Sequence, residues 1–473
     1  MLNQVQHDNT YWTAPNPCGN IKETKMKNSG IEWIGEIPDG WEVSRVKNFL
    51  SERTGGAWGD EKKNNANDII CLRIADFDYS RFKFNNSTEL TIRNYNTDII
   101  EKLLLKKDDI LVEKSGGGDK TPVGRAVIFE NSYKALFANF MDRLRVRNNI
   151  SALFFLYVWT TYYDNKYMLP YVKQTTGIQN LDITSILSGV FFPLPPKSTQ
   201  QRIASYLNKK CSKIEETIQN QQQVIEKLKA YKQSLITEAV TGKVKIANGK
   251  ICGEYESYKD SGVEYLGKIP SNWNVKRLRY IGKCQNGISK GGEFFGSGYP
   301  FVSYGDVYNN LVLPETVSGL IESTPEEQEN YSVTAGDIFF TRTSETIEEV
   351  GFTSVCLKTI EKATFAGFVI RVRPFTEELV PDYSKYYFSS DAHRRFFVKE
   401  MNLVTRASLS QDLLKRLPVL IPSKEEQKEI ANYLDKKCIA IDTAIEQKQN
   451  LIEKLTEYKK SLIYECVTGK KEI

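Results

Sequence analysis

The spacing of apolar and polar residues predicts two very long helices, from Ser198 to Ala239 and from Ser423 to Gly469. In both segments apolar residues recur at alternating steps of four and three, which places them on one stripe of a helix. Neither segment is interrupted by proline or glycine before Gly242 or Gly469, and Ser198 and Ser423 are candidate caps, with Gln201 and Glu426 three residues on. The predicted seam consists of Leu207, Cys211, Ile214, Ile218, Ile225, Leu228, Leu235, Leu434, Cys438, Ile441, Ile445, Ile452, Leu455 and Leu462.

Helices of this length need partners for their apolar stripes. About 40 residues make a rod of roughly 60 Å, whereas a typical globular helix has about 11 to 12 residues. One interpretation is an ordinary buried helix in each domain. The alternative that we favour is an intramolecular coiled coil, antiparallel if a pseudo-twofold axis relates the two helices. A parallel self-pairing dimer is disfavoured, because it would set Lys448 and Lys459 against their own copies.

The chain repeats itself in two places. SGIEWIGEIPDGW at 29–41 returns as SGVEYLGKIPSNW at 261–273. Residues 198–243 align without a gap on 425–470, and 25 of these 46 pairs are identical. The two halves therefore share a frame, and in the antiparallel arrangement the chain start near Ser29 lies close to the C-terminus.

The variable segments between the repeats, 42–195 and 274–421, have the pattern of α+β domains. Short apolar or alternating runs indicate strands at 68–74, 110–112, 125–129, 338–340 and 353–357, whereas the run at 153–159 fits a helix or a strand. Phe137-Ala-Asn-Phe140 matches Phe365-Ala-Gly-Phe368 at the same place in the second half. We therefore expect both variable segments to share one fold.

These patterns predict an α+β protein with two domains of similar fold, separated by a pair of long antiparallel coiled-coil helices with pseudo-twofold internal symmetry. The expected boundaries are a flexible N-terminal extension (1–28), a first domain (29–196), a central long helix (197–243), a linker (244–260), a second domain (261–421) and a C-terminal long helix (422–473).

Polar, glycine-containing loops interrupt the predicted strands in both halves. Their Arg, Lys, Gln, Asn, Ser and Thr side chains are the types that read base edges or bind phosphates, and glycine lets the backbone approach a duplex. Any single loop of this kind also fits a solvated hairpin, so it is their recurrence that favours DNA contact. The candidate DNA-binding residues are Lys114, Ser115, Lys120, Thr175, Thr176, Gln179, Asn180, Lys290, Arg342, Thr343, Ser344, Thr405, Arg406 and Ser408.

Composition narrows the function classes. The 473 residues carry 64 basic and 59 acidic side chains, a net charge of +5 that permits a nucleic-acid partner without requiring one. No apolar run reaches the roughly 18 residues of a membrane span, and 1–30 lack the core of a signal peptide, so we expect a cytoplasmic protein without a membrane partner. The eight cysteines form no CxxC and only two histidines accompany them, which indicates reduced, structural thiols and no metal site.

Known catalytic motifs do not fit the chain. The glycine-rich run 115–121 lacks the glycine that a P-loop needs before its lysine. A metal-dependent nuclease centre at Asp39, Glu61 and Lys63 is a weak alternative, because Ser271 replaces Asp39 in the second repeat. A coiled-coil scaffold that binds proteins rather than DNA is another alternative.

The heading motifs GIEWIGEIPDGW and GVEYLGKIPSNW, with the closing motifs YLNKKCSKIEETI and YLDKKCIAIDTAI, closely resemble the specificity subunit of Type I restriction-modification systems over about residues 26–473. Residues 1–25 have no counterpart before the second heading. The resemblance implies two target recognition domains that read an asymmetric, two-part DNA target, and a non-catalytic chain that binds no cofactor or metal. It also implies two modification subunits holding S-adenosylmethionine, which methylate adenine, and restriction subunits that use ATP and Mg.

Overall fold

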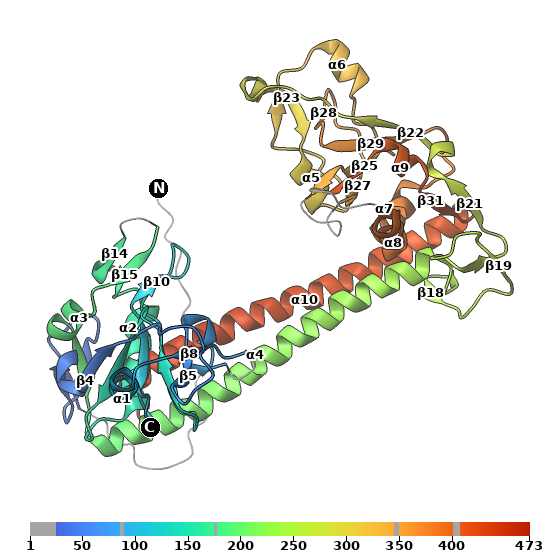
Figure 1. The fold of residues 1–473 in the computed structure, drawn as a ribbon. Coiled ribbons are helices and arrows are strands. Elements are labelled where there is room, and N and C mark those ends of the chain that lie inside the picture. Colours follow the sequence, from blue (N-terminus) through green and yellow to red (C-terminus); the bar gives the residue numbers. More distant parts are fainter. Residues whose placement is uncertain (1–24, 86–88, 175–176, 345–349, 401–406) are drawn as a thin grey trace, which may run out of the picture. The chain divides into compact units, whose positions relative to one another are not determined.

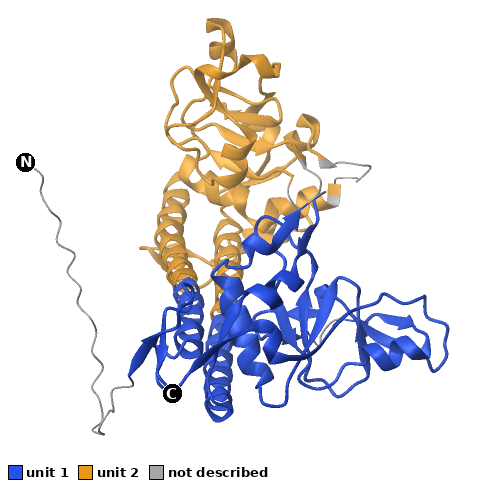
Figure 2. Ribbon diagram, turned by 90° about the vertical axis from the view of Figure 1, so that its left-hand side faces the viewer, with its two compact units in different colours: residues 1–220, 451–473 blue, residues 221–450 orange. Residues whose placement is uncertain are grey.

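The computed structural model describes residues 25–85, 89–174, 177–344, 350–400 and 407–473 (Figure 1). The chain divides into two compact units (Figure 2). Unit 1 comprises residues 1–220 and 451–473, and unit 2 comprises residues 221–450. Each unit therefore contains one variable segment and a part of both long helices. Within the described ranges, no helix combines the length and apolarity that crossing a membrane requires.

The two predicted long helices are present. Helix α4 (Lys197–Val240) and helix α10 (Lys424–Val467) each run for 44 residues without a break. Ser423 caps α10, because its Oγ accepts a hydrogen bond from the Glu426 N–H at 3.2 Å. The corresponding prediction for Ser198 is wrong: α4 starts at Lys197, since the Pro196 carbonyl already accepts from the Gln200 N–H at 3.0 Å.

Within each unit the parts of α4 and α10 run antiparallel. In unit 1, Lys459 Nζ lies 3.0 Å from Glu215 Oε2, and in unit 2, Lys232 Nζ lies 2.7 Å from Asp442 Oδ2. These four residues are the same two positions of the repeat, with the helices exchanged. Lys448 and Gln221 also occupy one repeat position, and Lys448 Nζ donates to Gln221 Oε1 at 3.0 Å. The predicted antiparallel coiled coil with internal pseudo-twofold symmetry is thereby confirmed.

The apolar seam of the helices continues into the core of each unit. All fourteen predicted seam residues are buried or half-buried. In unit 1 the core includes Leu207, Cys211 and Leu462, and in unit 2 it includes Leu235 and Leu434. The apolar stripe therefore packs both against the other long helix and against the attached domain. The coiled coil and the buried domain helix, the two interpretations of the sequence pattern, both hold in part.

The variable segments share a sheet topology, as their matching residues predict. In unit 1 the strand order is β11-β9-β13-β4, and in unit 2 the equivalent order is β27-β25-β29-β22. The strands of unit 1 are β4 (Leu50–Gly55), β9 (Ile110–Glu113), β11 (Ala126–Ile128) and β13 (Met141–Val146). Those of unit 2 are β22 (Gly282–Asn286), β25 (Ile338–Thr341), β27 (Thr353–Val355) and β29 (Val369–Pro374).

A second, smaller sheet in each unit contains one parallel pair. In unit 1 the order is β12-β5-β8, with β12 and β5 parallel, and in unit 2 it is β24-β23-β28, with β23 and β28 parallel. The bounds are β5 (Asp68–Leu72), β8 (Ile92–Asn94), β12 (Ala135–Phe137), β23 (Phe295–Val302), β24 (Leu320–Ile321) and β28 (Thr364–Phe365).

The apolar run at 153–159 is a helix. It belongs to α2 (Ala152–Asp164), whose cap Ser151 accepts from the Phe154 N–H at 3.4 Å. Thirteen residues exceed the usual length of a strand, and burial on all sides explains why no polar face interrupts the apolar run. Helix α7 (Pro381–Ser389) takes the corresponding place in unit 2.

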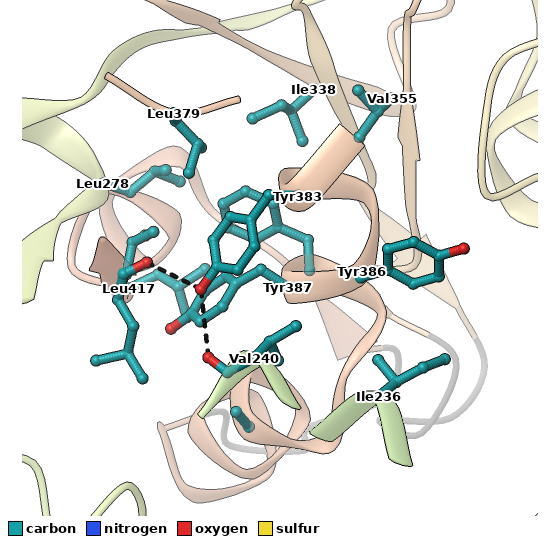
Figure 3. Close-up of a cluster of buried hydrophobic side chains, with 14 of the residues drawn as sticks. Ile236, Val240, Leu278, Ile338, Val355, Leu379, Tyr383, Tyr386, Tyr387 and Leu417 are labelled. Carbon is teal, nitrogen blue, oxygen red and sulfur yellow. Dashed lines mark hydrogen bonds between the residues drawn. The ribbon is translucent and has the colours of Figure 1, made fainter. Parts of the chain in front are cut away.

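The domain of unit 2 is fixed to the end of α4 through a buried tyrosine. Tyr383 of α7 donates its hydroxyl proton between two carbonyl oxygens, those of Val240 and Leu420, each at 3.3 Å (Figure 3). Burial raises the pKa of Tyr383 well above its ordinary value, so the hydroxyl stays protonated and able to donate. Leu417, Leu278 and Ile236 pack in the same cluster.

Apart from the strands of the candidate interface, which are described below, the remaining helices and strands are mostly short. In unit 1 they are β1 (Met26–Asn28), β2 (Glu36–Pro38), β3 (Glu42–Arg45), β6 (Phe77–Asp78), β7 (Lys83–Phe84), α1 (Thr97–Leu103), α3 (Ile183–Gly189) and β16 (Phe191–Leu194). In unit 2 they are β17 (Ile246–Ala247), β18 (Lys250–Ile251), β19 (Tyr258–Asp260), β20 (Lys268–Pro270), β21 (Asn274–Arg277), α5 (Tyr304–Asn309), α6 (Pro325–Asn330), α8 (Asp391–Glu400), α9 (Gln411–Lys415) and β31 (Pro418–Ile421).

The repeated heading motifs pack against the ends of the long helices. Gly469, at φ 74°, is so close to Pro38 that a Cβ atom would lie 2.3 Å from the Pro38 Cδ, and Gly242, at φ 69°, stands equally close to Pro270. Glycine is required at both positions for its backbone conformation and for the close approach. Because Pro38 contacts Gly469, the start of the first repeat lies beside the C-terminal end of the chain, as the antiparallel arrangement predicts.

Two expected boundaries differ from the structure. Residues 26–28, assigned to a flexible extension, form β1 because they pair with β2. Residues 244–260, assigned to a linker, contain the β17–β18 hairpin and β19. Most of the extension, residues 1–24, lies outside the described residues.

Candidate nucleic-acid interface

In unit 1 two polar loops that are distant in sequence meet in a small antiparallel sheet. Strand β10 (Ser115–Gly116) pairs with β15 (Gln179–Leu181), which also pairs with β14 (Val172–Gln174). The Ser115 hydroxyl donates to Asn180 Oδ1 at 2.6 Å, although 65 residues separate the two. The predicted DNA-binding residues Lys114, Ser115 and Asn180 therefore lie together at one edge of the domain.

Unit 2 contains the same arrangement with different side chains. Strand β26 (Thr343–Ser344) pairs with β30 (Ala407–Ser408). The Leu409 N–H donates to the Arg342 carbonyl at 2.7 Å, just as the Leu181 N–H donates to the Lys114 carbonyl at 2.9 Å in unit 1. Each predicted residue of this ladder thus has a counterpart 228 positions away, where Arg342 replaces Lys114.

The charge of the ladder differs between the units. In unit 1 the buried carboxylate of Asp142 lies 3.0 Å from Lys114 Nζ and 2.6 Å from Arg53 Nε. Two cations around one carboxylate leave an excess positive charge, which attracts phosphates. In unit 2 Ile370 occupies the position of Asp142, so the buried carboxylate of unit 1 is not repeated at this position.

Two other predicted residues of unit 1, Lys120 and Gln179, lie in or against the loop that follows β10. Lys120 is exposed beside a turn closed by the Gly118 N–H, which donates to the Thr121 carbonyl at 3.0 Å. Gln179, in contrast, is buried, and its Oε1 accepts from the Val123 N–H at 3.1 Å. Gln179 therefore holds the loop in place, and Lys120 remains accessible to a ligand.

The hydrogen-bond partners of Lys290 in unit 2 are not ladder residues. Its ammonium group donates to Glu327 Oε2 at 2.6 Å and to the Glu322 carbonyl at 2.8 Å. This ion pair lowers the pKa of the Glu327 carboxyl, and the charge of Lys290 is compensated locally. The predicted residues Thr175, Thr176, Thr405 and Arg406 lie outside the described residues, as does the side chain of Ser344.

Sequence reasoning missed Arg53 and Asp142, which set the charge at the unit 1 ladder. Arg53 lies in β4 and Asp142 in β13, 89 residues apart in sequence. Only the pairing of these two strands brings the side chains together. No linear motif marks them, and neither charge recurs at the matching position of the second half.

Matching ion pairs with buried carboxylates join residues at one end of the main sheet in both units. Arg145 Nε lies 2.7 Å from Asp109 Oδ1 in unit 1, and Arg373 Nε lies 2.7 Å from Asp337 Oδ1 in unit 2. Each carboxylate raises the pKa of its arginine, so the pairs stay charged. In unit 2 burial lowers the pKa of Arg371 to about 10. The matching pairs therefore stand at the same end of the main sheet in both units, opposite the end of β9 and β25 from which the ladders continue.

The alternative nuclease centre finds no support in the site geometry. Asp39 follows strand β2 of the heading hairpin, where its carbonyl accepts from Lys27 Nζ at 2.6 Å. The ammonium of Lys63 pairs with Asp60 at 3.0 Å. Among the described residues, no group of three or more His, Cys, Asp or Glu side chains is arranged to hold a metal ion.

Comparison with known proteins yields a consistent set of similarities. The family model described as "Type I restriction modification DNA specificity domain" matches residues 38–230 and again 270–456. The chain is 23% identical over 446 residues to the Type I restriction enzyme EcoKI specificity subunit of Escherichia coli K12, covering 92% of this chain and 90% of that protein. It is 26% identical over 467 residues to the putative Type I restriction enzyme MjaX specificity subunit of Methanocaldococcus jannaschii, covering 94% and 97%.

One solved structure has the same fold. It is described as the structural basis underlying complex assembly and conformational transition of the type I R-M system. The TM-score is 0.67 at 14% identity, and the match covers 92% of this chain and 99% of the other. Both repeats of the chain, including the long helices, are thus present in that fold.

Proposed function

Because the chain belongs to the Type I restriction modification DNA specificity family, we propose that it is the subunit that selects the DNA sequence on which a Type I restriction-modification complex acts. The observation that carries this proposal is the duplicated ladder. Units 1 and 2 present the same backbone arrangement, with Lys114, Ser115 and Asn180 in one and Arg342, Thr343 and Ser408 in the other. One framework with two sets of side chains suits a target of two unlike halves.

The ladder side chains match the chemistry of base reading. Arginine and lysine donate to guanine O6 and N7, asparagine pairs with adenine, and serine and threonine serve as donors or acceptors. The excess positive charge around Asp142 adds phosphate attraction in unit 1. Each unit reads its half-site in the major groove, since only that groove distinguishes all four base pairs.

The two long helices determine the unread gap between the half-sites. Both helices are continuous across residues that belong to both units. A helix resists changes of length, because its rise is about 1.5 Å per residue throughout. The chain therefore reads an asymmetric, two-part target in which spacing is part of the specificity.

The chemistry belongs to the partners. We assign S-adenosylmethionine and adenine methylation to two modification subunits, and ATP, Mg and DNA cleavage to restriction subunits, in keeping with the resemblance of the repeated motifs to this family. The present chain contributes sequence recognition and no catalytic group. Seven cysteines lie among the described residues, all of them free and six of them buried, which fits a reducing cytoplasmic location.

Methylation mapping tests this function. Co-expressed with its modification subunit, the chain should direct methylation to one bipartite sequence in genomic DNA. Exchange of residues 42–195 for the matching segment of another family member should change one half of that sequence and leave the other. Methylation at unrelated sites, or an unchanged target after the exchange, would contradict the proposal.

The two alternatives predict other results. A nuclease acting alone would cut DNA with magnesium and lose this activity on Glu61→Ala. A protein-binding scaffold would show no DNA affinity even with its partners. A DNA-reading complex should lose affinity steeply as salt rises, because binding releases counterions from the phosphates.

A further inference from the structure

Each unit carries one phenylalanine that is exposed at the tip of a tight turn. In unit 1 the turn is Ala138-Asn139-Phe140-Met141, closed by the Met141 N–H, which donates to the Ala138 carbonyl at 3.2 Å. In unit 2 it is Ala366-Gly367-Phe368-Val369, closed by the Val369 N–H, which donates to the Ala366 carbonyl at 3.0 Å. The two turns occupy the same place between a strand of the small sheet and the central strand β13 or β29.

The exposure of these rings stands out against their neighbours. Phe140 is 49% exposed and Phe368 is 63% exposed, whereas Phe137 and Phe365, three residues earlier, are fully buried. Met141 and Val369, which follow the exposed rings, are also fully buried. Single exposed apolar residues are common on protein surfaces. A phenylalanine exposed at the same turn in two otherwise divergent segments is a repeated feature of the framework.

Both rings stand directly beside the candidate DNA-reading ladder. The carbonyl of Phe140 accepts hydrogen bonds from the N–H groups of Lys114 at 2.8 Å and Ser115 at 3.2 Å. The carbonyl of Phe368 accepts from the N–H of Arg342 at 2.9 Å. These bonds fix the backbone of each turn against the first strand of its ladder, which places each exposed ring close to the ladder residues.

We propose that Phe140 and Phe368 are specificity-determining residues that contact the C5-methyl group of thymine in the major groove, one in each half-site. This inference rests on the proposed function. The thymine methyl is the apolar group on the major-groove base edges, and phenylalanine is a side chain suited to contact it. The neighbouring side chains are polar: Lys114, Ser115, Arg342 and Thr343. A protein partner would desolvate these polar groups, so we favour a DNA base as the group that contacts each ring. The turn hydrogen bonds hold the backbone that carries each ring in place before DNA arrives.

Replacement of thymine by deoxyuridine tests the contact, because deoxyuridine lacks only the methyl group. The complex with the modification subunit is titrated with duplexes that contain the recognised site, in which each thymine is replaced in turn. Loss of one buried methyl contact should weaken binding roughly fourfold. With the wild-type chain we expect such a loss at one or more thymines of each half-site.

The phenylalanine variants then show whether the ring makes this contact. Phe140→Ala should weaken binding to the unmodified duplex by a similar factor and abolish the further loss on uracil duplexes of one half-site only. Phe368→Ala should do the same in the other half-site. Phe375→Ala is the matched control, because Phe375 is 62% exposed but follows the opposite end of β29 from Phe368. It should bind every duplex as the wild type does.

Each outcome is decisive. Unchanged thermal midpoints of the exposed-ring variants exclude a general loss of folding. Affinity like the wild type, a uracil penalty that persists in both variants, or a variant that affects both half-sites equally would overturn the proposal. The last two results would point instead to a wedge between base steps or an indirect effect. If the wild-type complex shows no sequence preference at all, the proposed function fails, and this inference fails with it.

Discussion

The two equivalent ion pairs of the helix repeat should differ greatly in their contribution to stability. Lys459 and Glu215 of unit 1 are both about 10% exposed in their side chains, at an Nζ to Oε2 distance of 3.0 Å. Lys459 Nζ also donates to the Ser80 carbonyl at 2.6 Å and lies 5.0 Å from the centre of the Phe82 ring. We therefore choose Lys459→Met, which keeps most of the apolar stem and removes the ammonium group with its charge and its hydrogen bonds.

The expected loss follows from the charge left behind. Removing one partner of a buried pair typically costs about 3–5 kcal/mol, because the other charge stays buried without compensation. Glu215 and Lys459 line a cavity of about 340 Å³, which has room for water around the remaining carboxylate. We therefore expect the lower end, about 3 kcal/mol of unfolding free energy.

The repeat provides its own control. Lys232 and Asp442 of unit 2 form the equivalent pair, but their side chains are 27% and 55% exposed. Lys232→Met should cost about 0–1 kcal/mol, as exposed pairs do.

Urea unfolding of the wild type and both variants, followed by circular dichroism, measures the difference. The double variant Lys459→Met with Glu215→Leu should recover most of the loss, because no unpaired charge remains. Equal losses for Lys459→Met and Lys232→Met would refute the argument from burial, as would a double variant less stable than Lys459→Met alone.

Three further predictions concern a turn, a buried histidine and the helix length. Gly469→Ala should lower the unfolding free energy by more than the cost of a left-handed backbone conformation, about 1–2 kcal/mol, because the new Cβ would lie 2.3 Å from Pro38. Gly249→Ala is the control, because Gly249 has φ 68° and no atom within 4 Å of the added Cβ, so that it should show only the backbone cost in the same thermal unfolding assay. Burial lowers the pKa of His393 to about 3, so the unfolded chain binds a proton that the folded chain does not below pH ~6.5. Stability should therefore fall as the pH drops from ~6.5 toward 3, and His393→Leu should flatten the measured dependence; an identical slope would contradict a neutral buried histidine. Four residues inserted beside Leu228 should add about 6 Å and rotate the following helix by roughly 40°, which should lengthen the unread gap or abolish methylation, and an unchanged target would contradict the spacing role.

Periodicity and repetition were sufficient to predict the framework of the protein. The stripe from Leu207 to Leu235 specifies a helix because steps of four and three match the helical repeat. The stripe recurs from Leu434 to Leu462 in the second long helix. This recurrence made antiparallel pairing of the two helices a reasonable prediction from the sequence alone. The recurrence of Phe137-Ala-Asn-Phe140 as Phe365-Ala-Gly-Phe368 correctly predicted a shared domain fold. These signals are local, so they survive in a single sequence.

The candidate site was only partly predictable. Lys114, Ser115 and Asn180 were identified as loop residues of suitable chemistry, but their meeting depends on the pairing of β10 with β15. Gln179 has the same chemistry, yet it is buried and holds the loop. The composition of a loop shows which polar side chains are present. Only the pairing of the backbone strands decides which of these side chains point outward.

The sequence by itself determined the two long helices, their apolar stripe, the doubled framework and the class of side chain in each variable loop. The tertiary structure alone decided which copy of a repeated pair is buried. Lys459 and Lys232 stand at one position of the repeat, and the segment around Ser80 and Phe82 covers Lys459 in unit 1, whereas Lys232 remains partly open. Burial depends on residues that are distant along the chain, and so does the energy of every charge and every exposed ring.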